Sequence, residues 1–87
     1  MAYIVLIKDS AARSLAALPI QHRRRVDRKI RSLADDPRPP GCVKLAGATS
    51  GWRVRVGVYR ILYTIEDGRL IVTVVEVGHR RDVYRGL

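Results

Sequence analysis

The chain has 87 residues, 47% of them hydrophobic, which is enough for one globular domain with a thin core. Seventeen Lys and Arg residues against eight Asp and Glu give a formal charge of +9, which indicates a nucleic acid, a ribosome or an acidic protein as partner. No apolar stretch reaches the ~18 residues of a membrane span. The lone cysteine, Cys42, excludes an intrachain disulfide, so we expect a cytoplasmic protein without a membrane partner.

The first third of the chain predicts one strand and two helices. Residues 2–8 are rich in β-branched and aromatic side chains, as strands are. Asp9-Ser10 offers a helix N-cap, and apolar residues at helical spacing predict a short helix from Ser10 to Leu18. Pro19 ends that helix, and a second one is expected from Ile20 to about Ala34. Its apolar stripe consists of Ile20, Val26, Ile30 and Leu33.

The second half of the chain predicts three strands. A breaker segment, residues 35–41, separates it from the helices. Residues 51–56 alternate, with Trp52, Val54 and Val56 on one face and arginines on the other, and Gly57-Val58 forms a reversal. Residues 59–66 follow, and Asp67-Gly68 is a signal for a two-residue hairpin before a last strand over 69–77.

These elements predict one α+β domain over residues 1–87. The three later strands form an antiparallel meander, and the N-terminal strand adds to its edge. We therefore expect a small antiparallel sheet of about four strands, with the N-terminal helical hairpin packed on one face.

Arginines and proton-transfer groups are expected to gather on the opposite face of this sheet. Arg53 and Arg55 alternate with the apolar residues of their strand, and Arg60 stands in the next strand between Tyr59 and Ile61. A tail containing His79, Arg80, Arg81 and Tyr84 follows the last strand and has room to fold over the same face. The alternative for Arg53 and Arg55 is a solvated strand face. The alternative for His79 is a cap at the strand end, and the alternative for Tyr84 is a packing residue that anchors the tail.

Such a set of residues suits cleavage of RNA without a metal. The 2′-hydroxyl attacks the adjacent phosphorus once a base takes its proton, guanidiniums stabilise the phosphorane, and an acid protonates the 5′ oxygen. Carboxylates are too scattered for a two-metal nuclease, so we expect neither a metal nor another cofactor. A separate basic cluster on the second helix predicts a docking surface or, alternatively, a solvated helix face: Arg23, Arg24, Arg28 and Arg31.

The ordered set of motifs resembles the RelE/ParE superfamily of bacterial toxins, on its RelE side. The resemblance covers nearly the whole chain and is carried by these segments: the helical hairpin broken at Leu18-Pro19, Asp36-Pro37, Lys44-Leu45, Trp52 to Gly57, Tyr59 to Tyr63 and Gly78 to Tyr84. RelE-like toxins are ribosome-dependent mRNA interferases that cut the codon in the ribosomal A site. The resemblance thus implies an endoribonuclease that inhibits translation, with the 70S ribosome and mRNA as partners. It also implies a RelB-like antitoxin in a hetero-oligomeric complex.

Carried over by motif, the resemblance implies roles for individual residues. Arg60 and Arg80 stabilise transition-state charge, Tyr84 takes the 2′ proton and His79 is the candidate acid. Arg53 and Arg55 stand where the best-known members have lysines, so they retain charge stabilisation. The resemblance implies substrate binding by Arg53, Arg55, Lys44 and Arg81, and ribosome docking by the cluster on the second helix.

Two other functions stay open on the same scaffold. One is a ParE-like poison of DNA gyrase, although such chains tend to lack the arginine set and the terminal tyrosine. The other is a catalytically inactive module that binds RNA or the ribosome.

Overall fold

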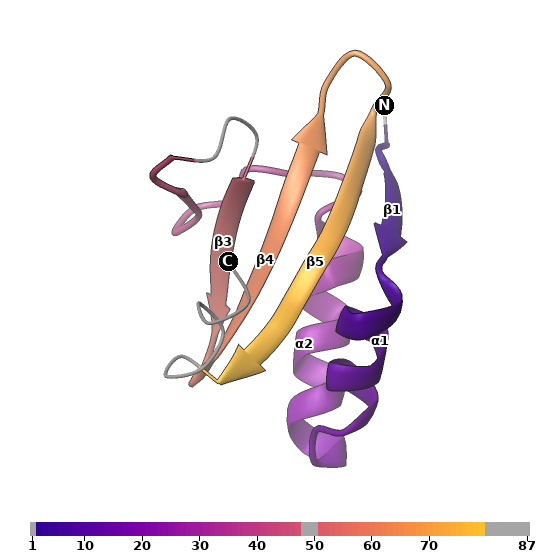
Figure 1. The fold of residues 1–87 in the computed structure, drawn as a ribbon, viewed down its shortest axis with the longest axis vertical. Helices are drawn as coiled ribbons and strands as arrows, with labels where there is room; N and C mark the ends of the chain where they lie inside the picture. The colour runs from indigo at the N-terminus through magenta and orange to yellow at the C-terminus, as the bar shows by residue number, and fades with distance from the viewer. Residues whose placement is uncertain (1, 48–50, 80–87) are drawn as a thin grey trace.

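The computed structural model describes residues 2–47 and 51–79 as an α+β fold, in which a five-stranded sheet carries two helices on one face (Figure 1). The strands are β1 (Ile4–Ile7), β2 (Val43–Lys44), β3 (Gly51–Val56), β4 (Tyr59–Glu66) and β5 (Ile71–His79), and the helices are α1 (Asp9–Ala16) and α2 (Ile20–Ser32). The order across the sheet is β1-β5-β4-β3-β2.

The predicted fold class is confirmed, with one strand more than expected and a mixed rather than antiparallel sheet. β1 lies beside β5 and runs parallel to it, pairing Ile4 with Ile71 and Ile7 with Val74. The other neighbouring strands are antiparallel. The additional strand, β2, has two residues at the opposite edge of the sheet.

The core lies between α2 and the sheet. Val26, Ile30 and Leu33, spaced at four and three residues, are at most 1% exposed and pack against strand residues such as Ile61 and Val77. Ile20 was predicted to share this stripe, but it is 47% exposed. It stands at the first residue of α2, beyond the edge of the core.

Two local predictions about helix and hairpin ends were wrong. The N-cap of α1 is Lys8, whose side chain makes no capping bond, and Asp9 lies inside the first turn, where its charge favours the helix dipole. The β4–β5 loop has four residues rather than two, because the strands close with Glu66 opposite Ile71. The left-handed residue there is Leu70, at φ 54°, rather than Gly68.

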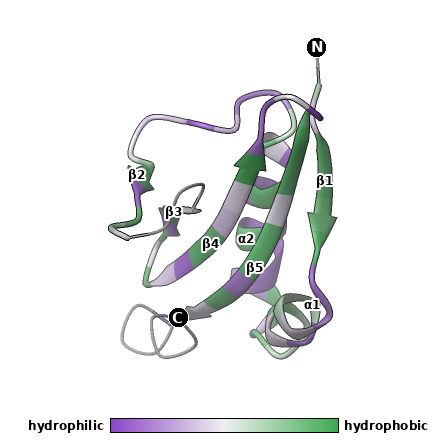
Figure 2. Cartoon of the chain, turned by 45° about the horizontal axis from the view of Figure 1, so that its top comes forward, coloured by the Kyte–Doolittle hydropathy of each residue, from purple (hydrophilic) through white to green (hydrophobic). Residues whose placement is uncertain are grey.

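A β-bulge in β5 decides which of its side chains reach the core. The register shifts between Leu62, which pairs with Glu76, and Tyr63, which pairs with Val74. Val75 is the extra residue. Because of it Val74 and Val77 both face the core, although they are three apart, and Glu76 is kept out of it. Hydrophobic residues dominate β1 and β5 (Figure 2).

Candidate functional site

The arginines of β3 and β4 share the sheet face that is turned away from the helices. Arg55 pairs with Arg60, and Arg53 pairs with Leu62. Paired residues project to the same side, and their neighbours Val54 and Ile61 point into the core. The predicted placement of Arg53, Arg55 and Arg60 on one face therefore agrees with the structure; we call these three residues the arginine face.

A glycine stands beside the centre of this face. Arg60 pairs on its other side with Gly78 of β5, so the row Arg55, Arg60, Gly78 carries two guanidiniums and then no side chain. Arg53 and Arg60 are half-buried, whereas Arg55 is exposed. A strand glycine often marks a place where another group approaches the backbone closely.

His79 lies on the opposite side of the sheet from the arginine face. It pairs with Tyr59, whose neighbour Arg60 points the other way. Its ring is 6.1 Å from that of Tyr59, which is in turn 5.1 Å from the ring of His22 on α2. The expectation that His79 joins Arg60 on one face was therefore wrong in this register. Arg80, Arg81 and Tyr84, which were expected beside it, lie outside the described residues.

Lys44 also lies apart from the arginine face. It pairs with Trp52, which packs against the core on the helix side, while Val43 pairs with Arg53. Sequence patterns did not mark the two-residue strand β2 and so placed Lys44 on neither face, and its expected role in substrate binding stays a prediction. Lys44 is exposed at the edge of the sheet.

The predicted docking cluster on α2 divides into parts with different surroundings. Arg31 forms an ion pair with Asp27, with Nε 2.9 Å from Oδ2. Arg23 and Arg24 line a hollow together with Leu15, Ile20 and Asp27. Arg28 lines a second hollow of about 410 Å³ on the β3 side of α2. The cluster is therefore two basic surfaces rather than one.

Few carboxylates lie in these surfaces; Asp27, the partner of Arg31, lines the hollow of Arg23 and Arg24. Glu76 of β5 lies opposite Leu62 and accepts a 3.4 Å hydrogen bond from the Ser14 hydroxyl. Among residues 2–47 and 51–79, no group of three or more His, Cys, Asp or Glu side chains is placed to hold a metal ion. The same residues include no helix with the length and apolar character of a membrane span.

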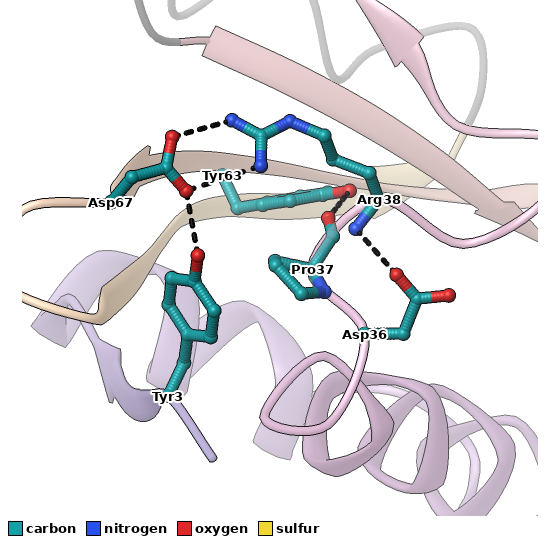
Figure 3. Close-up of polar contacts among 6 residues, drawn as sticks. All are labelled: Tyr3, Asp36, Pro37, Arg38, Tyr63 and Asp67. Atoms are coloured by element: carbon teal, nitrogen blue, oxygen red, sulfur yellow. Dashed lines mark hydrogen bonds and ion pairs between the residues drawn. The ribbon is translucent and has the colours of Figure 1, made fainter. Parts of the chain in front are cut away.

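A polar cluster that the sequence did not predict lies at the other end of the sheet. Arg38 donates to both carboxylate oxygens of Asp67, at 3.2 and 2.9 Å, and the Tyr3 hydroxyl donates to Oδ1 at 2.6 Å (Figure 3). We call these three residues the loop clamp, because they tie the segment after α2 to the β4–β5 loop and to the N-terminus. The hydrogen bond from Arg38, followed by that from Tyr3, lowers the pKa of Asp67 to about 2. The bond to Asp67 raises the pKa of Tyr3.

The buried hydroxyl of Tyr63 also holds the segment after α2. Tyr63, 1% exposed, donates a 2.7 Å hydrogen bond to the Pro37 carbonyl (Figure 3). Burial raises the pKa of this phenol. Arg38 also lies over the Trp52 ring, 5.1 Å from its centroid, a cation–π contact. The clamp therefore positions β3, and with it Arg53 and Arg55, without joining the arginine face.

A family model matches residues 5–84 of the chain. The family that it represents is the ParE toxin of the type II toxin–antitoxin system parDE. The chain belongs to the RelE/ParE superfamily of toxins. The match begins in β1 and runs past the end of β5, so it includes both helices and the arginine face.

Relatives and solved structures place this superfamily toxin near RelE proteins. Toxin RelG of Mycobacterium tuberculosis is 45% identical over 42 residues, which are 48% of this chain; the match spans less than half, 45%, of that relative. The RelBE2 toxin–antitoxin complex of M. tuberculosis matches with a TM-score of 0.80 at 28% identity, covering 92% of this toxin and all of that chain.

Two further structures agree on the fold of the toxin. The archaeal RelE–RelB complex from Pyrococcus horikoshii gives a TM-score of 0.81 at 27% identity, over 92% of this toxin and 97% of that chain. A variant of the E. coli toxin RelE in the free state gives a TM-score of 0.77 at 25% identity. That match covers 91% of this toxin and 84% of the RelE chain. The toxin thus matches a family model that is named for ParE and solved structures that are named for RelE.

Proposed function

We propose that this toxin is a ribosome-dependent mRNA endonuclease that cleaves the codon in the ribosomal A site and so inhibits translation. The observation that carries the proposal is the direct pairing of Arg55 with Arg60 on a face that neither helix covers. Like charges directly opposite each other destabilise a sheet. An anion between them, such as a phosphodiester, removes that repulsion.

The chemistry assigned to this face needs no metal. The mRNA's own 2′-hydroxyl attacks the adjacent phosphorus, the 5′ oxygen leaves, and a 2′,3′-cyclic phosphate remains. Arg60 and Arg80 stabilise the charge that develops on the phosphorane oxygens, since fixed cations are most effective where charge appears. Arg53, Arg55 and Arg81 hold the flanking phosphates, and the ribosome orients the codon.

The proton steps fall to the C-terminal residues. Tyr84 takes the 2′ proton in this scheme, since positive charge near a phenol favours the phenolate that can accept it. His79 is the candidate acid that protonates the departing 5′ oxygen, and that role requires its ring to leave the contact with Tyr59. Lys44, at the sheet edge, contacts RNA outside the reacting phosphate in this scheme.

The antitoxin of this system is proposed to be RelB-like. The similar structures include RelB–RelE complexes from bacteria and archaea. The formal charge of +9 calls for a partner that neutralises basic surface, so an acidic antitoxin chain in a hetero-oligomeric complex suits it. Action on translating ribosomes places the toxin in the cytoplasm.

The decisive experiment is primer extension on a defined mRNA in a purified translation system, with and without ribosomes. Wild-type toxin should cut within A-site codons only when ribosomes are present. Arg60→Ala should reduce the rate by roughly 10²-fold or more. The matched control is Arg69→Ala, which removes an arginine in the β4–β5 loop, where it pairs with Glu66. An mRNA with a 2′-deoxynucleotide at the cut position should resist cleavage.

The outcomes separate the proposal from its rival. Equal cutting by wild type and Arg60→Ala, or cutting of the deoxy-substituted mRNA, would exclude the mechanism. Failure of the wild-type toxin to cut would favour a ParE-like gyrase poison, which the name of the matching family model supports. A DNA supercoiling assay with purified gyrase then tests that function.

A further inference from the structure

A basic groove runs between α2 and the β3–β4 turn, apart from the reacting phosphate proposed above. Its volume is about 410 Å³, and its walls are Arg25, Arg28, Lys29 and Ser32 of α2 with Arg55, Val56 and Gly57. Four of these seven residues are cations and none is acidic. We call this hollow the helix-two groove.

The helix side of the groove is a regular line of donors. Residues 25, 28, 29 and 32 follow the i, i+3, i+4, i+7 spacing that places side chains on one face of a helix. At 1.5 Å rise per residue, the line from Arg25 to Ser32 extends for about 10 Å. A chain of phosphates lying along α2 meets several donors in succession.

The turn opposite α2 sets the position of one guanidinium. Gly57 has φ 61° in the two-residue turn that joins Val56 to Tyr59. A β-carbon at Gly57 would stand 3.7 Å from Nη1 and 3.8 Å from Nη2 of Arg25. The guanidinium of Arg25 therefore lies against the turn, and the two sides of the groove meet there.

The charges of the groove are not neutralised by neighbouring acids in the part of the chain that the structure describes. Ion pairs there join Arg31 to Asp27, Arg38 to Asp67 and Arg69 to Glu66, and none includes Arg25, Arg28, Lys29 or Arg55. The hollow on the other side of α2, by contrast, includes Asp27 in its wall. The helix-two groove is thus the more strongly cationic of the two hollows.

The lining favours a nucleic-acid backbone over a peptide. A bound peptide usually gains its affinity from apolar anchors in pockets, and the only apolar side chain in this lining is Val56. Guanidiniums suit phosphate oxygens because they donate two parallel hydrogen bonds. Arg55 belongs both to the groove and to the arginine face, so the two basic surfaces are continuous around β3.

We propose that the helix-two groove binds the phosphate backbone of structured RNA, as a second contact that holds the toxin while the arginine face engages the mRNA. The inference rests on the proposed function in one respect: the RNA it binds on a ribosome is ribosomal RNA. Of the predicted docking residues, the groove includes Arg28, and it adds Arg25 and Lys29 to them. Arg31 is not part of the groove, because it pairs with Asp27.

The test compares two variants of the full chain that lose the same charge. Arg25→Gln/Arg28→Gln removes two guanidiniums from the groove, whereas Arg13→Gln/Arg69→Gln removes two exposed arginines elsewhere. Fluorescence anisotropy measures binding to a short RNA duplex and to purified ribosomes over a series of salt concentrations. The groove variant should bind about tenfold more weakly or worse, and the slope of log K against log salt should fall by about two. The control should match wild type.

Each other outcome has a definite meaning. An unchanged slope, or an equal loss in both variants, would overturn the groove as a phosphate site. Loss of binding to an acidic peptide such as polyglutamate, with RNA binding intact, would assign the groove to a protein. Urea unfolding of both variants excludes misfolding. If the wild-type toxin fails to cleave mRNA but the groove variant still loses RNA affinity, the proposed function fails and the groove stands.

Discussion

Arg55 and Arg60 face each other directly across the β3–β4 hairpin, one exposed and the other half-buried. Natural sheets usually place unlike charges, or a charge and a neutral residue, at such positions, because a like pair costs roughly 0.2–1 kcal/mol. The pairing therefore lowers the stability of the hairpin unless a negative charge lies near both guanidiniums. In the proposed function that charge is the phosphodiester, so folding and phosphate binding make different demands on Arg55.

That separation can be measured by replacing Arg55. Arg55→Thr removes the repulsion and introduces a residue with high strand propensity, so the free energy of unfolding should rise by up to about 1 kcal/mol. Cleavage in the translation system should fall in the same variant. Urea unfolding monitored by circular dichroism gives the first quantity and primer extension the second.

Arg53→Thr is the matched control for this prediction. Arg53 pairs with Leu62 and Val43 rather than with a cation, and Leu62 is only 1% exposed. Shortening Arg53 uncovers apolar surface that its stem shields, so this variant should lose stability. If both variants are more stable than wild type, the strand propensity of threonine alone explains the change. If Arg55→Thr is less stable than wild type, repulsion between Arg55 and Arg60 does not destabilise the hairpin.

Tyr63→Phe should destabilise the fold by about 1–3 kcal/mol, because it leaves the buried Pro37 carbonyl without the hydroxyl that now donates to it. Urea unfolding at neutral pH measures the change. Tyr59→Phe is the control: it removes the hydroxyl of a half-buried strand tyrosine that contributes ring contacts to His22 and His79. Equal stability of Tyr63→Phe and wild type would show that water satisfies the carbonyl.

The loop clamp predicts a pH dependence of stability with a defined sign. The pKa of Asp67 falls from 3.8 to about 2 in the folded state, so its contribution is present above pH ~4 and is lost as the pH falls through 2. Asp67→Asn should lower the urea midpoint at pH 7, and the gap from wild type should close between pH 4 and 2. The reason is that protonation of the wild-type carboxyl removes the same ion pair with Arg38.

Glu66→Gln is the control for the clamp, since it removes the adjacent carboxylate without touching Arg38 or Tyr3. Its midpoint at pH 7 should stay near that of wild type, because a lone surface ion pair such as Glu66 with Arg69 contributes little. If the difference in urea midpoint between Asp67→Asn and wild type stays constant from pH 7 to 2, the charge of Asp67 does not contribute to the stability that the clamp provides.

Local patterns were sufficient to predict much of this fold. Alternation along residues 51–56 assigned Trp52, Val54 and Val56 to the core side and Arg53 and Arg55 to the other, and the structure agrees. The reversal at Gly57-Val58 follows from the left-handed backbone that glycine adopts readily. These features depend on residues within a few positions of one another.

Features that depend on distant residues were not predictable in this way. The register that sends His79 to the helix side comes from the β5 bulge, which the sequence does not mark. The clamp joins Arg38 to Asp67, and each looked like an ordinary loop charge. The face on which Lys44 stands was not predictable, because a strand of two residues has no periodicity to read.

The pairing of β1 with β5 has a consequence for the order of events in the cell. Residues near the start of the chain complete the sheet only by meeting residues 71–79, so the ordered fold depends on contacts of very long sequence separation. Such contacts form slowly and late. Until residues 71–79 have been synthesised and have met β1, the sheet that carries the arginine face is incomplete. A nascent chain without β5 therefore lacks the strand that places Gly78 beside Arg60.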